Sequence, residues 1–198
     1  MTQVLSTFTG FLQITPQMIL ESERSNDGRV IVQGVLQRAN AKNQNQRVYP
    51  KELLTREVES YKKKINEGLS GGELDHPDSS VVNLKNVSHK ITNLWWNNDD
   101  VVGTIEILST PAGNIAKELI KSGIQLGVSS RGMGSTTMKE GKTIVNDDFN
   151  LICWDLVSEP STHGAYLYPM NENVDKTQMN QKLNNINDLI IRIMETKL

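Results

Sequence analysis

Three separate segments of this chain carry side chains that could together perform nucleophilic catalysis. The first runs from Gly127 to Ser135, where three glycines and three serines surround a single arginine. A serine hydroxyl attacks a carbonyl carbon when a base takes its proton, and nearby backbone amides can stabilise the oxyanion that forms. Ser129, which follows the short apolar run 124–128, is the predicted nucleophile. A tight turn between two strands is the structural alternative for this glycine-rich run.

The second segment is the glycine-flanked loop predicted over residues 71–78, which contains His76. The proline that follows His76 restricts it to extended backbone, so the imidazole would be held on a stiff segment, as a positioned base requires. The same loop carries the carboxylates of Glu73, Asp75 and Asp78, which makes a metal site one alternative. Their spacing is looser than that of usual metal sites, so no metal and no other cofactor is predicted. A loop histidine without a catalytic role is the other alternative.

The third segment is a strand predicted over residues 149–157, which contains Asp155. Because side chains alternate along a strand, Asp155 has apolar neighbours on whichever face it occupies. An unpaired buried carboxylate is costly, so a partner is expected, and an imidazolium would be one. Cys153 in the same strand is an alternative nucleophile, but a cysteine in an apolar strand is typically inert.

Ser129, His76 and Asp155 would supply a nucleophile, its base, and a group that fixes the tautomer of the base and steadies its charge. Such triads are defined by geometry and occur in unrelated chain orders, so the order here does not establish that the three residues meet. The Gly-x-Ser-x-Gly elbow is not matched, because Arg131 occupies its fifth position. This mismatch argues against an α/β-hydrolase.

Composition sets limits on the class of protein. A chain of 198 residues is long enough for one large domain or two small ones. A net charge of −2 without a basic segment disfavours nucleic-acid binding. The single cysteine excludes an internal disulfide framework and suits a reducing compartment. The chain start does not resemble a leader and no apolar window approaches the ~20 residues of a membrane span, so we expect a soluble intracellular protein without a membrane partner.

Hydrophobic periodicity and turn residues predict a mixture of helices and strands. The predicted strands and hairpin arms are 29–37, 87–96, 101–108, 135–138, 143–145 and 149–157, and the predicted helices begin at Pro50 and Pro111. Residues 22–28 and 159–164 are expected to be loops. The polar stretch 169–182 is a predicted linker. Residues 183–198 form a predicted amphipathic helix that docks on the body or binds a partner.

Several motifs occur in an order that is specific when they are taken together. They are Gly-Glu-Leu-Asp-His-Pro at 72–77, Trp95-Trp96, Gly-Val-Ser-Ser-Arg-Gly-Met-Gly-Ser at 127–135, Asp155-Leu156-Val157 and Pro160-Ser161. The upstream run Asn-Gln-Arg-Val-Tyr-Pro at 45–50 fits the same set. In these motifs the chain resembles the prohead core proteases of T-even-type tailed phages. The resemblance covers residues 29–168, which would form the protease domain behind an N-terminal segment, 1–28, removed by processing.

The resemblance implies an α+β fold, a mostly antiparallel β-barrel wrapped by helices and related to herpesvirus assemblin. It implies a serine endopeptidase in the interior of a phage procapsid, which is assembled in the host cytoplasm. The expected substrates are scaffold or core proteins and the major capsid protein, and the enzyme finally degrades itself. A homo-oligomer is expected, with no nucleic-acid partner.

Carried over by position, His76 takes the place of the family's base and Ser129 that of its nucleophile. The Val-Ser-Ser match ranks Ser129 above Ser130. Asp155 is the expected third member; His163 is its rival, because assemblins use a second histidine there.

The oxyanion loop would comprise Ser130, Arg131 and Gly132. Arg131 would hold this loop in place while the backbone amides stabilise the oxyanion. Loss of one oxyanion donor typically costs ~10²–10³ in turnover.

Proteases of this type are similar in cutting after a glutamate that lies two residues beyond an aliphatic side chain. The chain contains this pattern at 19–21, 65–67 and 193–195. Autoprocessing is expected after Glu21 and Glu195, because chain termini are the most accessible to cleavage. Two other classes stay open: a non-catalytic component of the procapsid core, and a metal-dependent hydrolase that would use the 73–78 loop.

Overall fold

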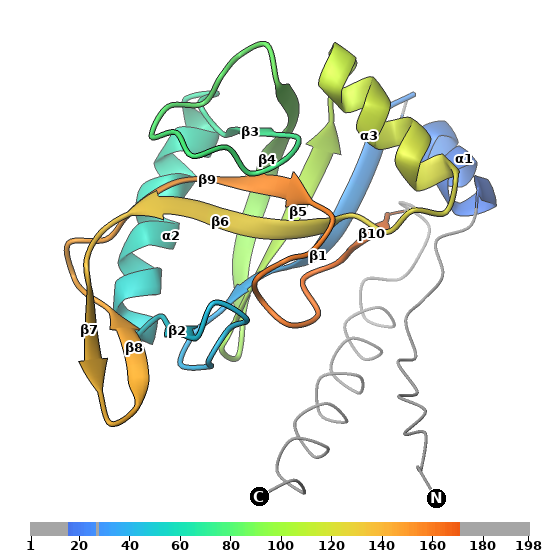
Figure 1. Ribbon diagram of the computed structural model, residues 1–198. Helices are drawn as coiled ribbons and strands as arrows, with labels where there is room; N and C mark the ends of the chain where they lie inside the picture. The colour runs from blue at the N-terminus through green and yellow to red at the C-terminus, as the bar shows by residue number, and fades with distance from the viewer. Residues whose placement is uncertain (1–15, 27, 171–198) are drawn as a thin grey trace, which may run out of the picture. The chain divides into compact units, whose positions relative to one another are not determined.

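The computed structural model describes residues 16–26 and 28–170. These residues form three helices and ten strands, and none of the described helices is long and apolar enough to cross a membrane (Figure 1). The helices are α1 (Pro16–Ser25), α2 (Lys51–Asn66) and α3 (Pro111–Lys121). The strands are β1 (Val30–Arg38), β2 (Arg47–Val48), β3 (Gly71–Glu73), β4 (Val87–Asn97), β5 (Asp100–Ile107), β6 (Gly127–Met133), β7 (Thr136–Lys139), β8 (Lys142–Val145), β9 (Asn150–Val157) and β10 (Leu167–Pro169).

The largest sheet has five antiparallel strands in the order β10-β1-β5-β4-β3. The predicted hairpin of β4 and β5 is confirmed, with Asn97 opposite Asp100 at its closed end. Asn98 in the turn has a φ of 53°, a left-handed conformation that asparagine tolerates better than most residues. The apolar side chains of β1, β4 and β5 enter the common core.

The remaining strands form two smaller sheets. No continuous ladder joins the described strands into the closed barrel that was expected. β6 pairs with β9 in antiparallel fashion, and β2-β8-β7 form a three-stranded sheet in which only β2 and β8 are parallel. Isolated bridges join Leu74 to Leu156 and Gly127 to Tyr166. The prediction of an α+β fold with mostly antiparallel strands is therefore confirmed, whereas the described ladders belong to three separate sheets.

The two helices predicted after Pro50 and Pro111 are confirmed, and both cover the core. α2 buries one apolar face, and its Tyr61 ring packs edge-on against Trp154 of β9, with 4.8 Å between ring centroids. α3 begins after Thr110, whose hydroxyl accepts a hydrogen bond from the Gly113 amide at 3.1 Å. This bond satisfies one of the free donors in the first turn of the helix.

Tertiary pairing changes several elements that local patterns suggested. The 71–78 loop begins with a strand, β3, because this segment pairs with β4. The glycine-rich run at 127–133 is the strand β6 and contains no tight turn. The loop expected over 22–28 begins only after α1 ends at Ser25. Residues 1–15 and 171–198, and with them the predicted C-terminal helix and Glu195, lie outside the described residues.

The buried His89 connects the large sheet to β9. It lies on β4 opposite Gly72, and its Nε2 and Nδ1 atoms are 3.0 Å from the Trp154 carbonyl oxygen and 2.8 Å from the Ser88 hydroxyl. A side chain at position 72 would collide with the His89 ring and the Trp154 carbonyl, which explains the glycine there. Burial lowers the pKa of His89 to about 4, and the hydrogen bond to Trp154 only partly opposes this effect.

Because of His89, the fold should lose stability as the pH falls, and this loss should begin at pH values above those at which ordinary carboxylates titrate. The unfolded chain protonates this histidine near pH 6.5, whereas the folded chain does so only near pH 4. The unfolded state therefore binds more protons within that window, and stability falls as the pH is lowered through it, by about 3 kcal/mol in total. Urea unfolding between pH 4 and 6.5 measures this loss. His89→Asn should flatten the pH dependence, while His163→Asn should retain it; equal slopes in all three proteins would contradict the assignment.

Candidate active site

The candidate residues meet where β6 and β9 run side by side beneath the loop that follows β3. Ser129 lies directly opposite Asp155 in the register of β6 and β9, and Arg131 lies opposite Cys153. Because side chains two residues apart share a face, all four point to the same side of this strand pair. Ser130 lies opposite Trp154, in the register position between them.

The loop that carries His76 is tied to β9 by its first two residues. Leu74 forms a bridge with Leu156, and the Asp75 amide donates to the Leu156 carbonyl oxygen at 2.9 Å. Asp75 has a φ of 68°, which turns the chain sharply before His76. These contacts bring His76 next to Asp155 although 79 positions separate the two residues in the chain.

His76 and Asp155 form the contact that the sequence predicted. The His76 Nδ1 atom lies 3.0 Å from the Asp155 Oδ2 atom, and the side chains are 40% and 0% exposed. Burial alone would raise the pKa of Asp155, but hydrogen bonds from His76, the Glu73 amide and Arg131 outweigh burial and lower it. An ionised Asp155 only accepts hydrogen bonds, so Nδ1 of His76 donates to it, and in the neutral imidazole Nε2 is then the nitrogen that can accept a hydrogen bond.

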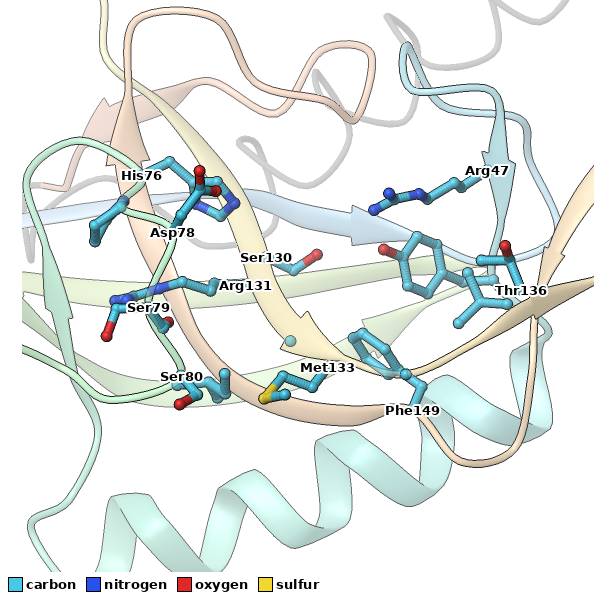
Figure 2. A pocket seen from close by; sticks show the side chains of 16 residues that line it. Arg47, His76, Asp78, Ser79, Ser80, Ser130, Arg131, Met133, Thr136 and Phe149 are labelled. Carbon is cyan, nitrogen blue, oxygen red and sulfur yellow. Dashed lines mark hydrogen bonds between the residues drawn. The ribbon is translucent and has the colours of Figure 1, made fainter.

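The two serines occupy different surroundings. The Ser129 Oγ atom lies 3.1 Å from the Ser161 Oγ atom, and Ser129 is 7% exposed. Ser130 lines a cavity, and Figure 2 shows its hydroxyl directed toward the side of Arg47. Among the described residues, no hydrogen bond joins either hydroxyl to His76. The structure thus brings His76 to Asp155, and places Ser129 on the same face without contact to the imidazole.

A cavity of about 680 Å³ opens beside His76. Its walls come from β6, from the loop after His76 and, on the opposite side in Figure 2, from Arg47; Tyr49 lines it as well. Arg47 belongs to the short strand β2, and within the described part of the chain its guanidinium has no carboxylate partner. Ligand-binding pockets commonly have volumes of about 300–1,000 Å³, so this cavity is large enough to be one.

The guanidinium of Arg131 does not face the cavity. It forms a buried cluster with two carboxylates. Its guanidinium donates to Asp155 from Nε at 2.8 Å and from Nη2 at 3.1 Å, and Nη2 also donates to Glu73 at 2.7 Å. Burial opposes the charge, but the hydrogen bonds that Arg131 donates to Glu73 and Asp155 outweigh it and raise the pKa of Arg131. A third donor, Nη1, reaches the Ser79 carbonyl oxygen at 3.0 Å and ties the His76 loop to β6.

The other candidate groups named from the sequence are Cys153, His163 and a metal site in the His76 loop. Burial raises the pKa of the Cys153 thiol to about 12, so the thiol is protonated at neutral pH and is a poor nucleophile. His163 is exposed, and no hydrogen bond joins it to His76, whereas Asp155 has one. In the described residues, no group of three or more acidic, histidine or cysteine side chains is arranged to hold a metal ion. Sequence reasoning treated Glu73 as a possible metal ligand and missed its pairing with Arg131.

A paired base and carboxylate beside a cavity, with a serine on the same strand face, are the parts of a hydrolase that uses a nucleophilic hydroxyl. Residues 10–178 match the family model of the prohead core protein serine protease. The chain is 34% identical over 161 residues to the prohead core protein protease of Enterobacteria phage T4, covering 73% of this chain and 74% of that protein.

Among solved structures, the chain is similar to the capsid assembly protease of bacteriophage T4. The TM-score is 0.62 at 32% sequence identity, and the match covers 66% of this chain and 82% of that one. The chain therefore belongs to the prohead core protein serine protease family, and it is a protease. The resemblance found in the sequence motifs is confirmed.

Loss of the buried guanidinium should destabilise the fold. Arg131→Met leaves Asp155 and Glu73 buried without their cation, which typically costs about 3–5 kcal/mol in the free energy of unfolding. Arg131→Lys keeps the charge but not the forked geometry, so it should cost less. Urea unfolding at pH 7 measures both, with Arg47→Met as an exposed arginine control expected to change stability by less than about 0.5 kcal/mol. A loss for Arg131→Met no larger than the control's would refute the importance of the cluster.

Proposed function

We propose that this protease is a serine endopeptidase in which Ser129 is the nucleophile, His76 the base and Asp155 the orienting carboxylate. The observation that carries the proposal is the 3.0 Å contact between His76 and Asp155, on the strand face that Ser129 shares. Directly opposite residues in an antiparallel pair have Cβ atoms roughly 4.5–5.5 Å apart. Ser129 is thus the direct cross-strand neighbour of Asp155, the carboxylate that holds His76.

The reaction would begin when Ser129 exchanges its contact with Ser161 for one with the Nε2 atom of His76. Catalytic hydrogen bonds commonly tighten only when substrate is bound, so the absence of this contact in the free enzyme is compatible with the role. His76 takes the hydroxyl proton as the Ser129 oxygen attacks the peptide carbonyl, and then gives that proton to the leaving amine. Water then attacks the acyl-enzyme. His76 takes a proton from the water and gives it to the Ser129 oxygen as the acyl group is released.

The oxyanion is expected to be stabilised by backbone amides in the segment from Ser130 to Gly132. This segment is part of the strand β6 and is not the loop expected from the sequence, and the Arg131 side chain anchors it to Asp155 and to the Ser79 carbonyl. Ser130 is the alternative nucleophile, and the observation in its favour is that it lines the cavity beside His76.

The choice between the serines can be tested by following cleavage in the cell. Wild type, Ser129→Ala and Ser130→Ala are each co-expressed with a candidate capsid scaffold protein, and both proteins are followed by intact mass. We expect cleavage by wild type and Ser130→Ala and a loss of about 10⁴-fold or more with Ser129→Ala, because loss of a triad member removes most of the rate. Cleavage that survives Ser129→Ala would overturn the assignment, and cleavage by none of the three would favour a non-catalytic core component.

The proposed substrates are the scaffold or core proteins and the major capsid protein, cut inside the procapsid. Similarity to a prohead core protein protease and to a capsid assembly protease supports this setting. Cleavage of the chain itself is proposed after Glu21, which is exposed in the middle of α1, and after Glu195. Cleavage at Glu21 would require α1 to unwind locally. Self-association stays a prediction.

Cleavage after glutamate is supported by the charge of the cavity. Arg47 extends into the cavity from the wall opposite His76 and pairs with no described carboxylate. Its backbone is fixed by pairing of β2 with β8 and by a hydrogen bond from its amide to the Asn43 side chain at 2.9 Å. A substrate carboxylate placed there would form a charge-assisted hydrogen bond with the guanidinium.

Removal of this charge should change specificity more than overall catalysis. Two fluorogenic peptides that differ only in glutamate or glutamine before the cleaved bond are compared by kcat/KM. Arg47→Ala should lower the value for the glutamate peptide by about 10- to 100-fold, the usual worth of a hydrogen bond to a charged group, and leave the glutamine peptide nearly unchanged. Arg29→Ala, a half-exposed arginine elsewhere, is the control. Equal losses for the two peptides would exclude Arg47 as the residue that recognises glutamate.

A further inference from the structure

The buried cluster contains an electrostatic conflict that the triad alone does not explain. Asp155 should stabilise the positive charge that His76 acquires during catalysis. Yet the same carboxylate accepts two hydrogen bonds from Arg131, at 2.8 and 3.1 Å. A carboxylate neutralised by a guanidinium presents little net charge to a neighbouring imidazole, so Arg131 by itself would weaken the effect of Asp155 on His76.

A second carboxylate resolves this conflict. Glu73 is fully buried, and its Oε1 atom accepts from Arg131 at 2.7 Å and from the Asn83 amide at 3.0 Å. Its Oε2 atom has no hydrogen-bond partner among the described residues. Two carboxylates against one guanidinium leave the cluster with one uncompensated negative charge, which a proton on His76 would neutralise.

We propose that Glu73 is a positioning residue that acts on His76 through Arg131 and Asp155. Its side chain balances the charge of Arg131, so that the negative charge of Asp155 stays available to the imidazole. Its backbone amide donates to the Asp155 Oδ1 atom at 3.0 Å and fixes the orientation of that carboxylate. These interactions lie where water is excluded, and charges there act more strongly on one another than at the surface.

The other charges near His76 do not supply the same field. From its own loop, Asp75 and Asp78 are exposed, and their influence is screened by solvent. Arg47 faces His76 across the cavity and would oppose an imidazolium (Figure 2). Cys153, in contact with both Arg131 and Asp155, is a neutral thiol at pH 7. Glu73 is therefore the buried group that offsets the guanidinium.

A purely structural role for Glu73 predicts something different. Glu73→Gln keeps the shape of the side chain and an oxygen for the Asn83 amide, but it removes the charge. If Glu73 only held the loop, this variant would alter stability without altering protonation of His76. If Glu73 sets the charge of the cluster, the imidazolium becomes less favourable, and His76 is half-protonated at a lower pH.

The test follows the His76 ring by NMR as a function of pH, in full-length chain carrying Ser129→Ala and Ser130→Ala to prevent self-cleavage. The signal is assigned by its loss in His76→Gln. Glu73→Gln should lower the midpoint of the titration by about one pH unit, a tenfold change in the protonation equilibrium. Asp100→Asn, which removes a buried carboxylate paired with Arg38 on the large sheet, should leave the midpoint unchanged. An unchanged midpoint in folded Glu73→Gln would overturn the proposal.

A double variant separates charge from shape. Glu73→Gln combined with Arg131→Gln again leaves one negative charge on the cluster, so the midpoint should return toward that of the parent protein. Failure of this reversal would contradict the electrostatic account. If Glu73→Gln alone does not fold, the double variant is compared with Arg131→Gln. These two proteins differ only in the negative charge of Glu73, which Arg131→Gln retains, so the His76 titration of Arg131→Gln should have the higher midpoint.

The catalytic consequence rests on the proposed function and is measured separately. In proteins that retain both serines, a fluorophosphonate probe reports the reactivity of the nucleophile without requiring a peptide substrate. Glu73→Gln should slow labelling about tenfold and shift the acid limb of its pH profile to lower pH, while Glu73→Asp, which keeps the charge, should recover part of the rate. Absence of labelling and of peptide cleavage in wild type would refute the proposed function, and the NMR titration would still decide the role of Glu73.

Discussion

The structure around the site depends on the desolvated carboxylate of Asp155. A charge without exposure to solvent requires several donors, and here Arg131, His76 and the Glu73 amide supply them. The Glu73 amide and His76 come from β3 and the loop that follows it, and Arg131 comes from β6, so satisfying one carboxylate of β9 fixes these three segments relative to β9. The positions of the proposed catalytic groups are thus a consequence of the requirement to pair a buried ion.

Buried ion clusters are weak contributors to stability, because removing the ions from water offsets most of their attraction. The cluster of Arg131, Glu73 and Asp155 is therefore better understood through its geometry and charge than through its net energy. Stability comes mainly from the apolar core beneath it, where Trp154 and Leu156 of β9 are fully buried and Tyr61 of α2 packs against Trp154. Alternation along β9 places Trp154 and Leu156 on one face and Asp155 on the other, which Asp155 shares with the buried Leu151 and Val157.

The cavity beside His76 has two walls that carry different side chains. One wall carries the proposed base, and the opposite wall carries Arg47, whose strand is fixed by the small sheet β2-β8-β7 (Figure 1). In the proposed function, the three-stranded sheet holds the cationic side of the cavity apart from the side that carries His76. A glutamate bound between the two walls would place its backbone near His76 and its carboxylate near Arg47.

Local sequence patterns were sufficient for the long elements, because α2, α3, β1, β4, β5 and β9 have clear periodicity and well-placed prolines and turns. The motifs also identified the family, and the rarity of a carboxylate in an apolar strand identified Asp155 as a residue that needs a partner. The sequence could not identify that partner fully. Short strands such as β3 and β6 exist because of pairing with distant strands, and the glycines in them suggested a loop and a turn. The pairing of Glu73 with Arg131 and the location of Arg47 across the cavity were decided only by the tertiary structure, because contacts between residues dozens of positions apart leave no periodic signal in a single chain.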